Sequence, residues 1–189
     1  MKAHQHDTPW CCSALSCLMS IALLIGCNTD NGVDSPVSTK KPVIVITDRK
    51  PAEEAIFLET NAVREKYGKT RLTQDARLRE LARDYSELML KHNFFGHVTP
   101  DGVTLSDRFE RFKISYHAIA ENLARYEGAF QTIPTREVVE GWLNSPGHRI
   151  NLLDEKNYGF THIGIGIAIG KSPSTSQPVY YYTQLFWLP

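Results

Sequence analysis

Cysteine is confined to the start of this 189-residue chain, and none follows residue 27: the four are Cys11, Cys12, Cys17 and Cys27. The region beyond residue 27 therefore has no disulfide and no metal site built on thiolates. An excess of charge is also missing, because 21 Lys and Arg residues balance 21 Asp and Glu residues. This balance favours neither nucleic acid nor a strongly acidic surface as a partner.

Several signatures of enzyme classes are absent as well. The chain contains no H-E-x-x-H, no G-x-S-x-G and no glycine-rich phosphate loop. A standard zinc protease, a serine hydrolase with a nucleophile elbow and a phosphate-loop enzyme are therefore unsupported. The sequence names no nucleophile, so it leaves open whether the protein is an enzyme.

One long apolar run occurs, over residues 11–26, and it carries no charge. It is short for a membrane span and suits the core of a signal peptide. Its end, Leu24-Ile25-Gly26-Cys27, resembles the bacterial lipobox, in which the cysteine is lipidated and becomes the new N-terminus. A buried globular helix is the alternative, but a polar, turn-rich segment follows at once. We interpret residues 1–26 as a lipoprotein signal peptide.

Residues 27–51 are rich in Asn, Asp, Ser, Thr, Pro and Lys. This composition predicts a flexible tether between the lipid and a folded domain. The apolar stretch 42–46 interrupts the tether and predicts either a short strand or a patch that docks on the domain.

Helical periodicity dominates the next part of the chain. It predicts helices over 52–67 and 75–93, a short helix around 105–112 and a fourth helix over 134–144. Thr73 or Asp75 can cap the second of these helices. Residues 114–120 are predicted to be extended.

The C-terminal part changes to a period of two. Isoleucines at 163, 165, 167 and 169 alternate with glycine and alanine, so the glycine face allows close packing. A second strand, 179–187, follows a loop and predicts an antiparallel pair. Residues 52–189 are thus predicted to form one α+β domain, with helices on both faces of a small antiparallel sheet.

Three polar residues follow predicted elements directly. His97 follows the second helix, Glu121 follows the extended stretch, and His148 follows a Ser145-Pro146-Gly147 stop after the fourth helix. They are far apart in sequence, so only the fold can bring them together.

Motifs within residues 52–189 occur in the order found in the CAP superfamily, which includes cysteine-rich secretory proteins, antigen 5 and plant pathogenesis-related proteins. The motifs are Asn61-x-x-Arg64, Phe95-Gly96-His97, Glu121-Asn122, Trp142-x-x-Ser145-Pro146-Gly147-His148-Arg149-x-Asn151, Gly164-x-Gly166 and Tyr182-Thr183-Gln184. The chain most resembles the bacterial, secreted, SCP-like branch. This resemblance implies an α-β-α sandwich and a location outside the cytoplasm.

The resemblance also implies a central cleft that carries two histidines and two glutamates in animal and plant members, some of which bind a divalent metal. His97 and Glu121 match two of these positions, while Tyr181 and Ser145 stand at the other two. The bacterial branch offers His148 near the same cleft, and Glu140 is a further candidate.

His97, Glu121 and His148 would suit a divalent metal such as zinc, with one coordination place left open. Each candidate also has a structural interpretation. His97 would bond a carbonyl, and Glu121 would cap backbone amides. Glu140 would lie on a solvated helix face, and Tyr181 would be a packing residue with a polar tip.

Three functions remain open. The first is a lipid-anchored binding module whose cleft holds a metal, a small apolar ligand or a cell-wall component. The second is a metal-assisted hydrolase, for example a peptidase, and the third is a surface interaction protein with a structural cleft. We favour the first, because the cleft set is incomplete and no nucleophile is visible. We expect a monomer with no nucleic-acid partner.

Lipidation of Cys27 is the first testable prediction. The protein should fractionate with membranes and the Cys27→Ala variant should not, because the lipid on sulfur provides the anchor. Asn28 follows the cysteine, so the outer membrane is expected in a bacterium with two membranes. Mass spectrometry of the exported protein checks this, and an intact N-terminus beginning with Met1 would contradict it.

Overall fold

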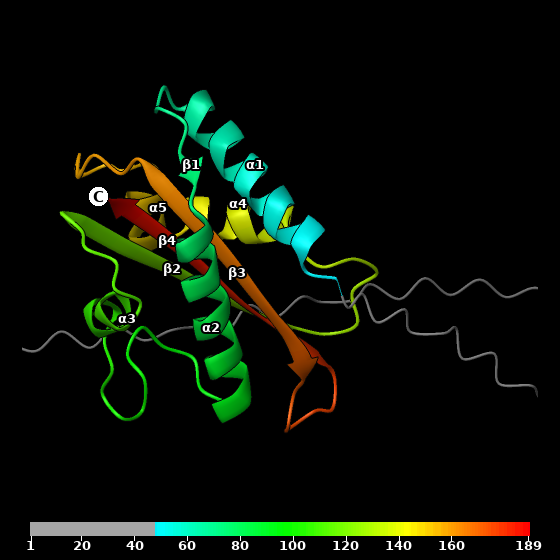
Figure 1. Ribbon diagram of the computed structural model, residues 1–189. Coiled ribbons are helices and arrows are strands. Elements are labelled where there is room, and N and C mark those ends of the chain that lie inside the picture. The colour runs from blue at the N-terminus through cyan, green and yellow to red at the C-terminus, as the bar shows by residue number, and fades with distance from the viewer. Residues whose placement is uncertain (1–47) are drawn as a thin grey trace, which may run out of the picture. The chain divides into compact units, whose positions relative to one another are not determined.

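The computed structural model describes residues 48–189 (Figure 1). The predicted signal peptide, Cys27 as the predicted lipidation site, nearly all of the predicted tether and the 42–46 patch lie outside the described residues. Within residues 48–189, no helix combines the length and the apolar character needed to cross a membrane.

A four-stranded sheet forms the centre of the fold, in the order β1-β3-β4-β2. Strands β2 (Ala118–Glu127), β3 (His162–Lys171) and β4 (Pro178–Leu188) are joined by antiparallel pairing, with β4 between the other two. The predicted pair of C-terminal strands is thus confirmed. The two-residue β1 (Thr73–Gln74) adds a parallel edge to β3, which makes the sheet mixed. Two residues carry no periodicity, so the sequence did not predict β1.

Strand β2 differs from the predicted extended stretch, 114–120. It starts later and continues to Glu127, pairing with β4 along its whole length. Glu121 therefore lies inside a strand and not after one. The register places Glu121 opposite Leu185 of β4, on the face of the sheet that also carries Thr183.

Four predicted helices are confirmed, namely α1 (Lys50–Lys66), α2 (Ala76–His92), α3 (Leu105–Arg111) and α4 (Arg136–Asn144). A fifth helix, α5 (Pro146–Leu152), was not predicted. The Ser145-Pro146-Gly147 segment ends α4, as expected, but it also starts α5. Proline is well suited to a first helical turn because its missing N–H has no partner there in any case. His148 consequently lies within a helix.

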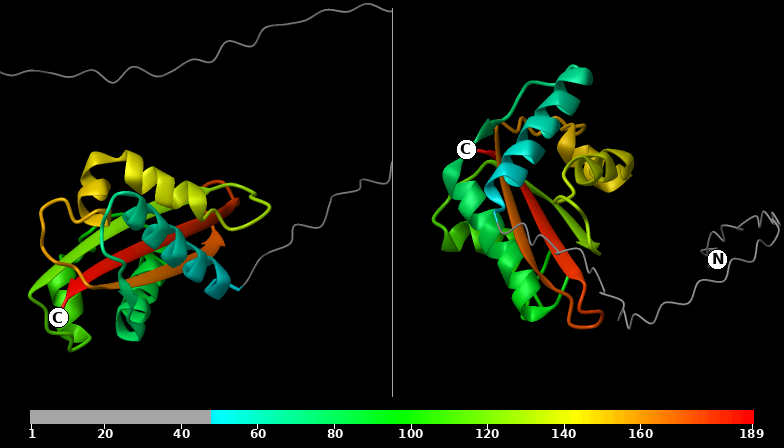
Figure 2. Two further views of the ribbon diagram at one scale, coloured as in Figure 1. Left: turned by 90° about the horizontal axis from the view of Figure 1, so that it is seen from above. Right: turned by 90° about the vertical axis from the view of Figure 1, so that its right-hand side faces the viewer.

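Helices cover both faces of the sheet. Helices α1, α4 and α5 pack on one face around Ile56, Trp142 and Tyr182, in a core that also contains Ile163 and Ile165. Helix α2 covers the opposite face, where Leu81 and Tyr85 are fully buried, and α3 lies beside it. Figures 1 and 2 show α2 and the α4–α5 pair on opposite sides of the strands. This arrangement is the predicted α-β-α sandwich.

Helix α2 lies directly against the glycines of β3. A Cβ atom added at Gly164 would come within 2.4 Å of the Leu78 carbonyl carbon, and one at Gly166 within 2.2 Å of the Ala82 carbonyl carbon. Only glycine permits this separation. The partner that packs on the predicted glycine face is therefore the backbone of α2.

The ends of α2 are also fixed. The Asp75 side chain accepts hydrogen bonds from the backbone N–H groups of Arg77 and Leu78, so Asp75 and not Thr73 is the N-cap. At the other end Asn93 is left-handed, with φ 49°, which stops the helix and turns the chain toward His97.

Trp142 on α4 provides a test of this core. It is 2% exposed, and its Nε1 donates to the Leu123 carbonyl at 3.0 Å. Trp142→Ala should lower the free energy of unfolding by about 3–5 kcal/mol, the range for deleting a buried large aromatic side chain. Trp142→Phe should cost less, about 1–3 kcal/mol, because mainly the hydrogen bond is lost.

Denaturant melts of the full chain measure both changes. Leu58→Ala is the control, since Leu58 is 50% exposed on α1 and should cost within about 0.5 kcal/mol. A loss below about 1 kcal/mol for Trp142→Ala would contradict the core assignment.

Candidate functional site

Glu121 is the centre of the candidate site. Its side chain is 2% exposed, although it is a carboxylate in the middle of β2. Both oxygens accept hydrogen bonds from the Arg108 guanidinium, Oε2 from Nη1 at 2.6 Å and Oε1 from Nη2 at 3.1 Å. Such a two-point ion pair is strong and directional, and it satisfies a buried charge that would otherwise be costly.

Arg108 comes from α3 and is itself buried. Its guanidinium carbon lies 3.3 Å from the ring centroid of Tyr85 on α2, and Nη2 also donates to the His97 carbonyl at 3.1 Å. The Tyr85 hydroxyl donates to the Gly96 carbonyl. Burial raises the pKa of Tyr85 to about 12, so this hydroxyl keeps its proton and remains a donor. One guanidinium thus joins α2, α3, β2 and the loop that carries His97.

His97 lies beyond the end of α2 with its Nδ1 2.9 Å from Glu121 Oε1. A carboxylate only accepts hydrogen bonds, so we assign the proton to Nδ1. The neutral ring then keeps its lone pair on Nε2. The side chain is 58% exposed, which leaves that nitrogen available to a ligand.

His148 is held from the other side of the sheet edge. Its Nδ1 is 2.9 Å from the Ser145 hydroxyl, and its backbone carbonyl accepts from Asn122 at 3.1 Å. Burial lowers the pKa of His148, and the positive charge of His97 lowers it further. The two imidazoles are therefore within electrostatic range of each other, on either side of residues 121–122.

A chain of amides fixes α5 against the sheet. Asn122 donates to Gln184 at 2.9 Å, and Gln184 donates to Thr60 of α1 at 2.9 Å. Asn151 of α5 donates to the Glu121 carbonyl at 3.2 Å and to the Asn122 side chain at 3.0 Å. These bonds connect three elements to β2, so the position of His148 does not depend on the Ser145 turn alone.

The other two predicted site residues are placed differently. Glu140 is exposed on α4, and its side chain forms no hydrogen bond or ion pair with another described residue. Tyr181 is 2% exposed, and its hydroxyl accepts from Arg125 Nε at 3.2 Å. Its ring centroid lies 6.4 Å from that of Phe95, so Tyr181 supports the loop before His97.

Arg108 is the site residue that the sequence did not reveal. A charged residue beside Phe109 on a short helix is expected on the solvated face, and no motif contains it. The only available signal was Glu121 itself, because a buried carboxylate needs a cationic partner.

A metal centre on His97, Glu121 and His148, as the sequence predicts, would have to compete with Arg108 for the Glu121 carboxylate. Between Asp48 and Pro189, no three side chains of His, Cys, Asp or Glu gather closely enough to hold a metal ion. At Glu121 the permanent positive charge of Arg108 lies against both carboxylate oxygens, and this charge disfavours a second cation there. The arrangement instead orients one imidazole, with Nε2 of His97 as a hydrogen-bonding group.

The shifted pKa of His148 leads to a measurable pH dependence. The folded protein holds a proton on His148 less tightly than the unfolded chain does. The contribution of His148 to the free energy of unfolding is therefore fully present above the ordinary pKa of about 6.5, and it declines as the pH falls from about 6.5 toward the lowered pKa of the folded state. In His97→Asn, the His148 midpoint should move upward while staying below about 6.5, because the charge is lost and burial remains.

Titration of the imidazole signals by NMR measures this midpoint. His117→Asn is the matched control, since His117 is exposed and contributes nothing to the shift of His148. An unchanged His148 midpoint in His97→Asn would show that the two rings do not interact.

The sequence model of the cysteine-rich secretory protein family, CAP, matches residues 57–186. The uncharacterized protein YkwD of Bacillus subtilis is 39% identical over 125 residues, which is 66% of this chain and 46% of that protein. The uncharacterized membrane protein YlbC of the same organism is 36% identical over 116 residues, 61% of this chain and 31% of that protein. The chain thus matches less than half the length of each of these relatives.

Solved structures give the same result. An extracellular protein containing an SCP domain from Bacillus anthracis is 31% identical with a TM-score of 0.59, covering 74% of this chain and 41% of its own. An outer surface protein of Borrelia burgdorferi is 25% identical with a TM-score of 0.58, covering 74% of this chain and 94% of its own. Together with the confirmed sandwich fold, these matches show that the chain belongs to the CAP family of cysteine-rich secretory proteins.

Proposed function

We propose that this protein is an extracytoplasmic CAP-domain binding module, attached to the membrane by a lipid on Cys27. Its cleft at His97, Glu121 and His148 holds a small polar ligand, and a fragment of the cell wall is the class we favour. Bacterial relatives that are described as extracellular, outer surface and membrane proteins support the location.

The observation that carries this proposal is the engagement of Glu121. Its two oxygens accept from Arg108, and Oε1 also accepts from His97. These three bonds use three of the roughly four lone-pair sites of the carboxylate, and the side chain is 2% exposed, so a ligand reaches Glu121 less readily than it reaches His97. Glu121 therefore orients His97 and does not itself receive the ligand.

The surroundings of His97 suit binding. Phe95 and Val98 on either side of it are 52% and 50% exposed, so apolar surface flanks a polar group. Ligand sites commonly combine apolar walls with a few oriented hydrogen-bonding groups. A cell-wall fragment offers both, since its sugar rings have apolar faces and its hydroxyl and amide groups form hydrogen bonds.

Calorimetry with soluble peptidoglycan fragments and the full chain in detergent tests the proposal. His97→Ala and His148→Ala should each weaken binding by about tenfold, the effect of losing one oriented hydrogen bond to a ligand. His117→Ala is the control and should bind like the wild type. Equal binding by all four proteins would remove the ligand-binding role of the cleft.

Zinc is tested in the same way, at about pH 7.5 and about pH 5.5, because histidine binds metal only when neutral. The occupied carboxylate leads us to expect weak zinc binding at either pH. Tight binding at the higher pH that His148→Ala abolishes would favour a metal ligand over the cell-wall fragment.

A hydrolase using the same cleft is the second candidate, and one contact favours it. The Ser145 hydroxyl lies 2.9 Å from His148 Nδ1, the separation of a nucleophile from its base. The same contact also arises when an N-cap serine meets the third residue of its helix, as it does in α5. Labelling with a fluorophosphonate distinguishes the two. We expect none, and labelling that Ser145→Ala abolishes would favour the hydrolase.

A further inference from the structure

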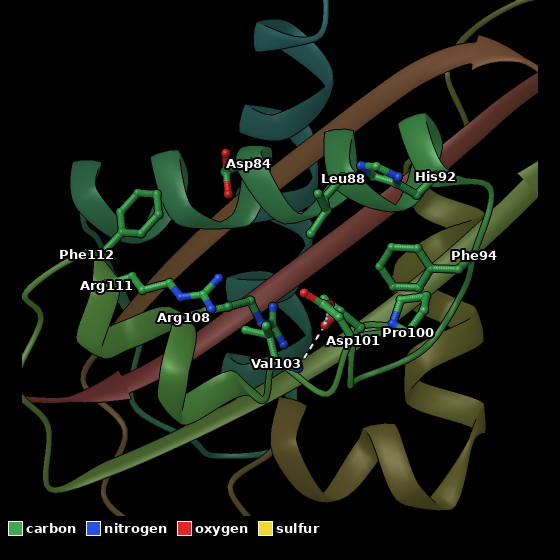
Figure 3. Close-up of a pocket in the computed structure, with 11 residues that line it drawn as sticks. Asp84, Leu88, His92, Phe94, Pro100, Asp101, Val103, Arg108, Arg111 and Phe112 are labelled. Atoms are coloured by element: carbon green, nitrogen blue, oxygen red, sulfur yellow. Dashed lines mark hydrogen bonds between the residues drawn. The ribbon is translucent and has the colours of Figure 1, made fainter.

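A cavity lies on the α2 face of the sheet, between α2, α3 and the loop that connects them. It has a volume of about 400 Å³, within the range of small-molecule sites, roughly 300–1,000 Å³. Figure 3 shows the side chains of both helices and the loop converging on it. His97, Glu121 and His148 do not line this cavity, although Arg108 does.

Apolar side chains form much of the wall. They come from all three surrounding segments and are Leu88, Phe94, Pro100, Val103 and Phe112. Val103 is buried, and Leu88, Phe94 and Phe112 are half-buried, so the apolar surface lies deeper than the exposed charged residues of the lining. The cavity therefore offers an apolar body a place out of water.

Two opposite charges face the same space without pairing. Asp84 extends from α2 and Arg111 from α3, and both side chains point toward the cavity in Figure 3. No ion pair within 4.0 Å joins them, and neither side chain forms a hydrogen bond in the part of the chain that the structure describes. Together with hydrogen bonds from Thr99 and Thr104, the more distant charge of Arg111 lowers the pKa of Asp101, in the same lining, and of Asp107. Burial raises the pKa of the Asp84 carboxyl, and neighbouring Glu87 acts in the same direction, against Arg108.

The remaining charges of the lining are already used or weak. Arg108 is committed to Glu121, and Asp101 accepts a hydrogen bond from the Thr99 hydroxyl. His92 is exposed at the rim of the lining. A ligand that satisfies Asp84 and Arg111 together needs one positive and one negative group, with an apolar part between or beside them.

We propose that this cavity binds a free α-amino acid with an apolar side chain. The ammonium group pairs with Asp84, the carboxylate pairs with Arg111, and the side chain packs on Leu88, Phe94 and Phe112. Arginine binds a carboxylate through two parallel hydrogen bonds, and the aspartate accepts from the ammonium. This site is separate from the His97 cleft and does not depend on the function proposed for it.

Calorimetry on the full chain in detergent tests the proposal with four probes. L-phenylalanine carries both charges and an apolar side chain. Hydrocinnamate lacks the ammonium group, phenethylamine lacks the carboxylate, and glycine lacks the apolar side chain. L-phenylalanine should bind best, and each of the other three should bind at least about tenfold more weakly, because each loses one set of contacts.

Two variants assign the contacts. In Asp84→Asn, L-phenylalanine should lose its advantage over hydrocinnamate, because the ammonium group then has no carboxylate partner. In Arg111→Gln, it should lose its advantage over phenethylamine for the corresponding reason. Such a cycle isolates each pair from general effects of the substitution. Both residues are exposed, so the fold should survive either change.

Matched controls are available away from the cavity. Glu65→Gln on α1 and Lys91→Gln on α2 remove one charge of each sign from exposed residues that do not line the cavity, and they should preserve the wild-type order of probes. The proposal is overturned by the absence of saturable binding of L-phenylalanine at millimolar concentration. Equal binding of all four probes, or binding of hydrocinnamate alone, overturns it too.

Discussion

The close approach of α2 to the glycines of β3 is the constraint on which the rest of the structure depends. At Gly166 the backbone of α2 occupies the volume that a Cβ atom would need, so α2 packs on the sheet at this one position. In this position Tyr85 is buried, and the chain leaves the left-handed C-cap Asn93 into the loop that carries His97. The position of the His97 imidazole therefore depends on the absence of side chains at Gly164 and Gly166 of β3.

The buried charge of Glu121 is the second constraint, and it acts on function more than on stability. A buried ion pair repays little of its desolvation, although removing one partner costs about 3–5 kcal/mol because the other charge is left alone. Here the pair also receives the stacking of Arg108 on Tyr85 and the hydrogen bond from His97. These contacts favour the tautomer of His97 with its proton on Nδ1. They also engage the Glu121 carboxylate, the group that would otherwise act as a metal ligand or a general base.

Much of the fold was predictable because α1, α2 and β3 carry clear periodicity of 3.6 or 2. The failures have local causes. Proline and glycine usually end helices, so the sequence predicts a stop at Pro146 and Gly147. The structure shows Pro146 in the first turn of α5, where a residue needs no N–H for helical hydrogen bonding. The site was predictable only in part, since His97 and Glu121 were identified while Arg108 was not. Its guanidinium is buried by Tyr85, more than twenty positions away, and no short pattern encodes that contact.

Arg108 lines the cavity and also bonds Glu121 at the candidate site, so its replacement would affect both places. One side of its guanidinium holds Glu121, while the residue also lines the cavity beside Asp84. Replacing it would release a buried carboxylate, free His97 and enlarge the cavity at once, so its loss could not be assigned to either site. Asp84 and Arg111 line the cavity, whereas the ring of His148 lies beside the Ser145 hydroxyl. Two connections link the sites: the guanidinium of Arg108, and the loop between α2 and α3, which carries both His97 and the cavity-lining Phe94. Double-mutant cycles between the two sets of residues therefore measure any coupling.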